Sequence, residues 1–208
     1  MNKHSALILI DLQNDFFPGG SLGVPGADAI FPLANTVQDL FDFVVATQDW
    51  HPQNHTSFAS NHPSKKAFEV IDLNGIPQVL WPDHCVQGTK GAEFHSKLRK
   101  DKISKIIHKG TDPKIDSYSA FYDNAHLKET ELEPFLKEKG IHTVYIMGLA
   151  TDYCVYYSVL DAVKLGFKTY LIEDGCFGIN KNTGDVENAL KQMKQAGATI
   201  IKSSSLRS

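Results

Sequence analysis

Residues 143–154 read Thr143-Val144-Tyr145-Ile146-Met147-Gly148-Leu149-Ala150-Thr151-Asp152-Tyr153-Cys154. The apolar run at 143–147 is typical of a buried strand, and the periodicity after it predicts a helix over about 151–165. Cys154 would then lie in the first turn of that helix, just past the carboxyl end of the strand. Because helix N-termini favour thiolate over thiol, and open α/β sheets bind ligands at the carboxyl ends of their strands, Cys154 is a candidate nucleophile. A buried structural cysteine is the alternative interpretation.

Five further apolar runs of strand length recur along the chain. They are continuous rather than alternating, which is typical of parallel strands that are covered on both faces. Since helical patterns separate several of them, the sequence predicts an α/β fold, a doubly wound and mostly parallel sheet of about six strands with helices on both faces. The five runs lie at residues 6–10, 43–46, 103–107, 167–172 and 198–201.

Helical periodicity fills the gaps between these runs. Pro32 falls early in the first pattern, where a proline is tolerated. Thr130 and Glu133 resemble a capping box, and Gly140 follows as a C-terminal stop. The expected helices cover about 30–41, 130–140, 151–165 and 186–197.

The length and composition indicate one domain over residues 1–208. The chain is 42% hydrophobic, enough to bury a full core, and its net charge of −3 argues against a nucleic-acid partner, which needs a basic surface. Three cysteines without a Cys-x-x-Cys spacing fit a reducing compartment. The run at 6–10 meets Asp11 too soon for a signal peptide or a membrane span. We therefore expect a cytoplasmic protein with no membrane partner, whose helix faces leave open whether it forms a homo-oligomer.

A long aperiodic region at about 50–102 interrupts this alternation. It is rich in Pro, His, Asn and Gly, and its only periodic part predicts a short helical turn near 93–98. Because a loop of this length in a compact domain is usually functional, its histidines direct attention to metal binding.

The candidate metal ligands are one aspartate and three histidines. Asp49 and His51 lie two residues apart at the end of a predicted strand, so their side chains point the same way if the extended conformation continues. His55 and His84 follow in the long loop region, and such a donor set suits Zn²⁺, Fe²⁺ or Mn²⁺. His62 is a rival ligand from the same region. The alternative interpretation is that these are loop residues with hydrogen-bonded side chains.

Two further charged residues lie at the ends of predicted strands. Asp11 follows the run at 6–10, and Lys109 ends the run that begins at 103. Because a parallel sheet brings the carboxyl ends of its strands to one edge, Asp11, Lys109 and Cys154 are expected at one crevice. Taken singly, a turn residue and a solvated strand terminus explain the first two equally well.

A nucleophilic Cys154 would need neighbouring groups that lower the pKa of its thiol. A free thiol has a pKa of about 8.5, and lowering it to about 7 requires roughly 2 kcal/mol. A helix N-terminus supplies about 0.3–1 kcal/mol, so a nearby lysine cation is expected to supply the remainder. An aspartate that accepts the thiol proton and returns it to a leaving amine completes an acid–base cycle. With the N–H groups of Ala150 and Cys154 placed for an oxyanion, the set fits acyl transfer at an amide.

Several different motifs follow one another in a fixed order over nearly the whole chain. They are Ile10-Asp11-Leu12-Gln13-Asn14-Asp15-Phe16, Gln48-Asp49-Trp50-His51-Pro52, Asn54-His55-Thr56-Ser57-Phe58, Trp81-Pro82-Asp83-His84-Cys85-Val86-Gln87-Gly88-Thr89, His108-Lys109-Gly110 and Gly148-Leu149-Ala150-Thr151-Asp152-Tyr153-Cys154-Val155. In this combination the chain resembles the nicotinamidase (pyrazinamidase) branch of the isochorismatase-like cysteine hydrolases. The resemblance implies a hydrolase that converts nicotinamide to nicotinate and ammonia through a cysteine thioester, in NAD salvage.

The resemblance also implies roles for individual residues. Cys154 would be the nucleophile, Asp11 the proton shuttle and Lys109 the cation beside the thiolate. A cis peptide between Leu149 and Ala150 would turn the Ala150 N–H toward the oxyanion. One divalent metal ion, Zn, Fe or Mn, would be bound by Asp49, His51, His55 and His84, with His55 preferred to His62. The substrate contacts would be Phe16, Trp81, Tyr118, Leu149 and Ala150.

Two other functions remain as alternatives at this stage. A related cysteine hydrolase would act on another substrate, such as a carbamoyl amide or isochorismate, although members without the metal cluster would not need three histidines. A noncatalytic metal-binding protein on the same fold would have a poorly reactive Cys154. Dinucleotide binding is excluded because no Gly-x-Gly-x-x-Gly motif follows the first strand.

Overall fold

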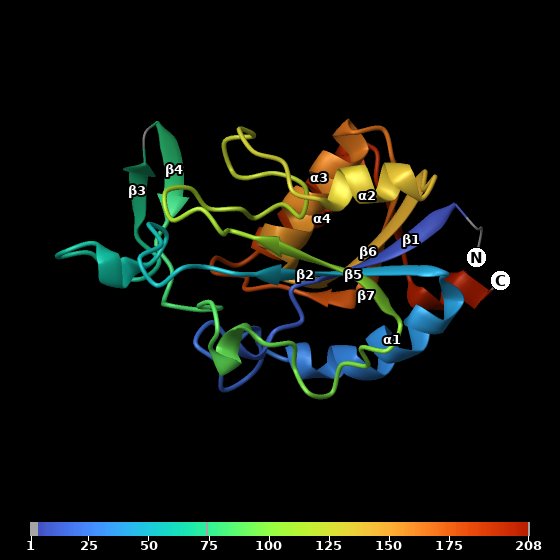
Figure 1. Cartoon of the computed structure of the whole chain (residues 1–208), viewed down its shortest axis with the longest axis horizontal. Coiled ribbons are helices and arrows are strands. Elements are labelled where there is room, and N and C mark those ends of the chain that lie inside the picture. The colour runs from blue at the N-terminus through green and yellow to red at the C-terminus, as the bar shows by residue number, and fades with distance from the viewer. Residues whose placement is uncertain (1–3, 74, 208) are drawn as a thin grey trace.

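The computed structural model describes residues 4–73 and 75–207 and contains a six-stranded sheet in the order β5-β2-β1-β6-β7-β8 (Figure 1). Every neighbouring pair in this sheet runs parallel. The predicted strands and the doubly wound α/β fold are thus confirmed. The strands are β1 Ser5–Ile10, β2 Phe43–Asp49, β5 Ile103–Lys109, β6 Thr143–Leu149, β7 Lys168–Phe177 and β8 Thr199–Ile201.

Helices cover both faces of the sheet, as Figure 1 shows, with α1 on one side and α2, α3 and α4 on the other. Successive residues of β1 explain the two layers, since Leu7 and Leu9 join one apolar cluster while Ala6, Ile8 and Ile10 join the other. All six residues of β1 are buried, which accounts for its unbroken apolar sequence. The helices are α1 Ile30–Val37, α2 Leu132–Glu138, α3 Tyr156–Lys164 and α4 Asp185–Ala196.

Two helix starts differ from the prediction. A π-helical turn, Thr151–Val155, precedes α3, so Cys154 lies in this turn and not in the first turn of an α-helix. At α2 the N-cap position belongs to Glu131, and no capping box forms. The Thr130 hydroxyl accepts a hydrogen bond from the N–H of Leu132 (3.1 Å), while the Glu133 carboxylate accepts one from the Tyr122 hydroxyl (3.1 Å) instead of reaching back to the cap.

The long region at 50–102 contains an antiparallel hairpin that the periodicity did not predict. Its strands are β3, Val70–Leu73, and β4, Ile76–Val79, which stand apart from the main sheet in Figure 1. The sequence signal for it is Asn74-Gly75, a dipeptide typical of two-residue hairpin turns. No helix forms at 93–98 in the described residues; the expected helical turn is reduced to a single turn in which the N–H of Leu98 donates to the carbonyl of His95 (3.0 Å). A 3₁₀ turn, Lys90–Ala92, lies just before it, and Phe94 pairs with Gln13 in an isolated bridge.

The remaining regular elements are short 3₁₀ turns: Asn14–Phe16, Ala27–Ala29, Gln38–Leu40, Ala59–Asn61 and Ser203–Arg207.

Within residues 4–73 and 75–207, no helix combines the length and the apolar character that crossing a membrane requires.

The carboxyl ends of β1 and β6 approach each other closely at a glycine. Gly148 has φ +136° and lies opposite Ile10 in the parallel register. A Cβ at this position would overlap the backbone carbonyl of Ile10. Only glycine therefore lets the two strand ends meet here, immediately before the residues that lead to Cys154.

We predict that Gly148→Ala lowers the free energy of unfolding by about 3 kcal/mol, because it combines left-handed backbone strain with an overlap at Ile10. Gly19→Ala is the matched control. Gly19 also has a positive φ (+94°), but no atom lies within 4 Å of an added Cβ, so strain alone costs about 1 kcal/mol. Urea unfolding followed by circular dichroism measures both. Equal losses would contradict the importance of the close approach.

Candidate active site

A buried lysine ammonium joins the ends of three neighbouring strands. Lys109, the last residue of β5, has a fully buried side chain whose Nζ lies 2.9 Å from Asp11 Oδ2, just past β1. The same nitrogen donates to Asp49 Oδ1 at the end of β2 and to the carbonyl of Ser117 (2.9 Å). It also lies 3.4 Å from Cys154 Sγ. The structure thus brings Asp11, Lys109 and Cys154 together, as their positions at strand ends predicted.

Burial and charge together set the protonation of this cluster. Burial disfavours the Lys109 cation, but the carboxylates of Asp11 and Asp49 outweigh it and raise the pKa of Lys109 well above its ordinary value. Burial also raises the pKa of Asp11, although the nearby lysine opposes this shift. Lys109 is therefore the fixed positive charge of the site.

The Cys154 thiol has a raised pKa, not the lowered one expected from the sequence. Burial is the largest cause, Lys109 opposes it, and the carboxylates of Asp11 and Asp49 raise the pKa further. The expectation was wrong because it counted the cation and the helix end but not the desolvation or the second carboxylate. A base must therefore remove the thiol proton, and Asp11 is the adjacent carboxylate.

Asp11 is held in place through Thr47 of β2. The Thr47 hydroxyl donates to Asp11 Oδ1 (2.5 Å) and accepts a hydrogen bond from the Asp11 N–H (3.1 Å). Asp11 has φ +51°, a left-handed conformation in which aspartate is among the more tolerant residues. This turn of the main chain directs the carboxylate across the end of the sheet toward Lys109.

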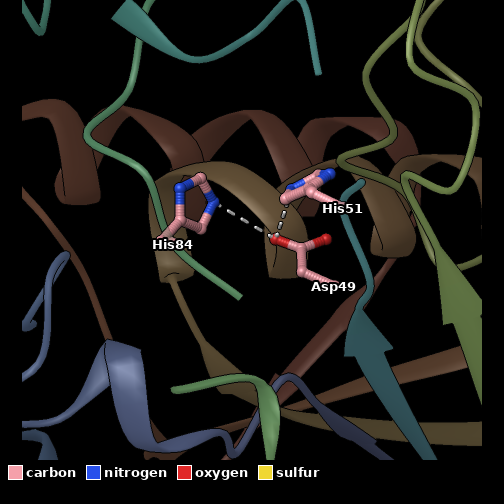
Figure 2. Close-up of side chains that lie close together, drawn as sticks. All are labelled: Asp49, His51 and His84. Atoms are coloured by element: carbon pink, nitrogen blue, oxygen red, sulfur yellow. Dashed lines mark ion pairs between the residues drawn. The ribbon is translucent and has the colours of Figure 1, made fainter. Parts of the chain in front are cut away.

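Three of the four predicted metal ligands converge on one point. Figure 2 shows His51 and His84 pointing at the Asp49 carboxylate, whose Oδ2 lies 3.6 Å and 3.7 Å from their Nε2 atoms. The other ring nitrogens are used by main-chain carbonyls, Nδ1 of His51 by that of Gly110 (2.9 Å) and Nδ1 of His84 by that of Pro82 (2.8 Å). With Nδ1 of each ring engaged in this way, the Nε2 atoms are the ones that face Asp49.

The donor set fits a divalent ion. His51 Nε2 is buried and has no hydrogen-bond partner in the described part of the chain, which is costly unless a further group is bound there. Two imidazoles and a carboxylate within 4.8 Å of one another match the ligand types of Zn²⁺ and Fe²⁺.

His55 does not join this cluster. Its Nδ1 accepts a hydrogen bond from the N–H of Ser57 (3.1 Å), and its Nε2 faces the carbonyl of Ile115 (3.3 Å). Burial lowers the pKa of His55 to about 4, so the ring is neutral with both nitrogens already engaged. His55 instead packs against His51, with ring centroids 4.3 Å apart, and forms with His51 and Asp116 a second group whose ligand atoms lie within 4.8 Å of one another, so its role as a fourth ligand stays a prediction. His62 also lies apart, with its Nε2 against the carbonyl of Thr56 (2.7 Å).

A cavity with mostly apolar walls opens beside Cys154. Three aromatic residues expected there, Phe16, Trp81 and Tyr118, do line it. Leu149 is fully buried and is not part of the lining, whereas Ala150 is; the peptide between them is cis, as the resemblance implied. The full lining is Phe16, Leu22, Asp49, Trp81, His84, Asp116, Tyr118, Ala150, Tyr153, Cys154 and Ile179.

Two chemically important residues of this cavity were missed in the sequence. Asp116 is buried and accepts hydrogen bonds from Gln78 Nε2 (3.0 Å) and from the N–H of Ser117 (2.8 Å). Tyr153 stands edge-on to Trp81, with ring centroids 4.8 Å apart. The only sequence signal for either residue was its position: Asp116 lies in the loop that follows β5, and Tyr153 directly precedes Cys154.

Comparison with known proteins agrees with this geometry. A family model described as the isochorismatase domain matches residues 5–205. Nicotinamidase of Acinetobacter baylyi is 49% identical over 201 residues, which cover 97% of this chain and 94% of that protein. The solved structure of the Acinetobacter baumanii nicotinamidase/pyrazinamidase superposes with a TM-score of 0.96 at 51% identity and covers 99% of both chains.

Two other solved structures contain small molecules or ions. One is a protein of L. infantum in complex with nicotinate (TM-score 0.86, 36% identity, covering 98% of this chain and 96% of that one). The other is the pyrazinamidase of Pyrococcus horikoshii in complex with zinc (TM-score 0.78, 40% identity, covering 96% and 99%). Both similarities extend over almost the whole chain. The chain therefore belongs to the isochorismatase family, in its nicotinamidase/pyrazinamidase branch.

Proposed function

We propose that this chain hydrolyses nicotinamide to nicotinate and ammonia through a thioester on Cys154. The observation that carries the proposal is the Lys109 ammonium, which contacts Asp11, Asp49 and Cys154, the last two of which line an aromatic cavity. Full-length relatives that are nicotinamidases support the choice of substrate.

The reaction divides into two acyl transfers. Asp11 accepts the thiol proton while Sγ of Cys154 forms a bond to the carboxamide carbon, and Lys109 stabilises the sulfur charge. The N–H groups of Ala150 and Cys154 donate to the oxyanion. Asp11 then protonates the leaving amine, so that ammonia departs and a thioester remains. Water attacks the thioester with Asp11 as base, which releases nicotinate and restores the thiol.

A divalent ion would be held by Asp49, His51 and His84. Zinc is favoured because the Pyrococcus horikoshii relative contains it, while Fe²⁺ and Mn²⁺ suit the same donors. When bound, such an ion supplies a Lewis acid with open positions that a pyridine nitrogen can occupy. His84 and Asp49 both line the cavity, so a ring held there has its carboxamide near Cys154.

The aromatic walls would recognise the ring. Trp81 stands edge-on to both Tyr118 and Tyr153, and its Nε1 donates to the Tyr118 hydroxyl (3.2 Å). This bond fixes the orientation of the indole, so the cavity presents flat apolar faces to a planar heterocycle. A planar ring amide is the substrate class that such walls suit best.

Cys154→Ala is expected to reduce ammonia release from nicotinamide by on the order of 10⁴-fold or more, since no other group can form the thioester. Cys176→Ala, which changes a partly buried thiol of β7 outside the cavity lining, should leave ammonia release unchanged. A coupled ammonia assay measures both variants. Full activity in the Cys154 variant would refute the thioester route.

Asp11→Asn should lower kcat by about 10²–10⁴-fold, because the amide keeps the shape of the side chain but cannot accept the thiol proton. Its zinc content should stay that of the unmodified protein. Asp39→Asn, at a surface carboxylate paired with Arg99, serves as the control and should keep kcat. Steady-state kinetics and elemental analysis decide the matter, and an unaltered kcat for Asp11→Asn would exclude the carboxylate as the base.

Histidine variants are expected to separate ligands from neighbours. His84→Ala should lose bound zinc and ammonia release together, whereas His62→Ala should keep both. His55→Ala should also keep zinc, because both nitrogens of His55 have other partners. Elemental analysis of the purified proteins provides the measurement. Loss of zinc from the His55 variant would restore it as a ligand and overturn the three-residue set.

A further inference from the structure

Every second residue of the segment after β1, from Asp11 to Asp15, contacts the candidate active site or the loop beside it. Asp11 pairs with Lys109, and Gln13, two residues further on, has a wholly buried side chain. Gln13 Nε2 donates to the carbonyl of Asp49 (2.7 Å) and to that of Ala92 (2.9 Å). Its Oε1 accepts from the N–H of Asp49 (2.8 Å). One side-chain amide thus pairs with both main-chain groups of a metal-ligand candidate.

The course of the backbone explains why an amide is needed here. The paired register of β1 with β2 ends at Leu9 and Ala46, and the chain turns away at Asp11. Asp49 lies three residues beyond Ala46 on β2, so β1 does not reach the main-chain groups of Asp49. Gln13 supplies a donor and an acceptor in the arrangement of a peptide group and takes the place of the missing strand.

Asp15, two residues further on, holds the loop that carries His84. Its Oδ2 accepts a hydrogen bond from the N–H of Cys85 (2.8 Å), and its Oδ1 accepts from the Ser21 hydroxyl (3.1 Å). Cys85 has φ +47°, so this turn depends on outside support. A Cβ at Gly91 would overlap the Asp15 carboxylate, so a glycine at this position leaves room for it.

We propose that Gln13 and Asp15 are positioning residues of the metal site, with Gln13 holding Asp49 and Asp15 holding His84. The inference rests on the metal-binding part of the proposed function. Gln13 acts on the main chain of Asp49 itself, and Asp15 acts on that of Cys85, the residue after His84; neither contacts a ligand atom. Because partners in the outer shell of a metal site keep its ligands in the geometry the ion requires, their loss should appear as weaker metal binding.

Gln13→Met tests the first half, since methionine fills a similar volume but makes none of the three hydrogen bonds. Its affinity for Zn²⁺ should fall by about 10–100-fold. The affinity is measured on the purified metal-free protein, by zinc titration in competition with a chromophoric chelator. The matched control is Gln38→Met: Gln38 is equally buried and donates to the main-chain carbonyl of Arg99 (3.1 Å). These two residues precede the amino ends of β2 and β5, whereas the proposed ligands Asp49 and His51 lie at or beyond the carboxyl end of β2. The control should bind zinc as tightly as the unmodified protein.

Asp15 variants test the second half and remain informative if Gln13→Met fails to fold. Asp15→Ala removes the acceptor for the Cys85 N–H and should also weaken zinc binding by about 10-fold or more. Asp15→Asn keeps an oxygen for that N–H and can donate to the Ser21 hydroxyl, so it should restore the affinity. A general loss of stability would lower the melting temperature of the metal-free protein without this pattern.

The outcomes separate the two claims. Unchanged zinc affinity in Gln13→Met and Asp15→Ala, with zinc bound by the unmodified protein, would overturn the positioning roles and leave the metal site standing. An equal loss in Gln38→Met would also overturn them. Absence of zinc binding in the unmodified protein would instead refute the metal site itself, and the positioning roles with it.

Discussion

The buried ammonium of Lys109 is the group on which the rest of the site depends. A lone cation buried this deeply costs several kcal/mol, and it persists only with good partners. Asp11, Asp49 and the carbonyl of Ser117 provide them. These partners come from β1, β2 and the loop after β5, so the charge is satisfied only when the strand order β5-β2-β1 is in register. The same cation links the proposed nucleophile Cys154 to the proposed metal ligand Asp49.

Charge balance connects the two halves of the site. Lys109 carries one positive charge between the two carboxylates of Asp11 and Asp49, which leaves an excess of negative charge beside Cys154. That excess is one reason for the raised thiol pKa. A divalent ion at Asp49, the group that its donor set fits, would offset it. The proposed metal ligands and the proposed catalytic residues are thus parts of one electrostatic unit rather than two neighbouring sites.

The sequence could predict much of this arrangement because it follows from one geometric rule. Continuous apolar runs identify parallel strands, and residues just past their carboxyl ends meet at a common edge. Asp11, Asp49, Lys109 and Cys154 are all placed by that rule. This rule did not predict the hairpin of Val70–Leu73 and Ile76–Val79, because its four-residue strands lie outside the main sheet and carry no long apolar run.

The sequence by itself determined the strands of the main sheet, their common edge and the residue types that gather there, because these depend on local periodicity and on a parallel sheet. Only the tertiary structure decided that His84 faces Asp49 while His55 faces the carbonyl of Ile115, because both histidines lie in aperiodic loops whose course depends on long-range packing. It also decided the raised pKa of Cys154, since desolvation depends on everything packed around the sulfur. The contacts of Gln13 with Asp49 likewise join residues from different strand ends, and no spacing along the chain encodes them.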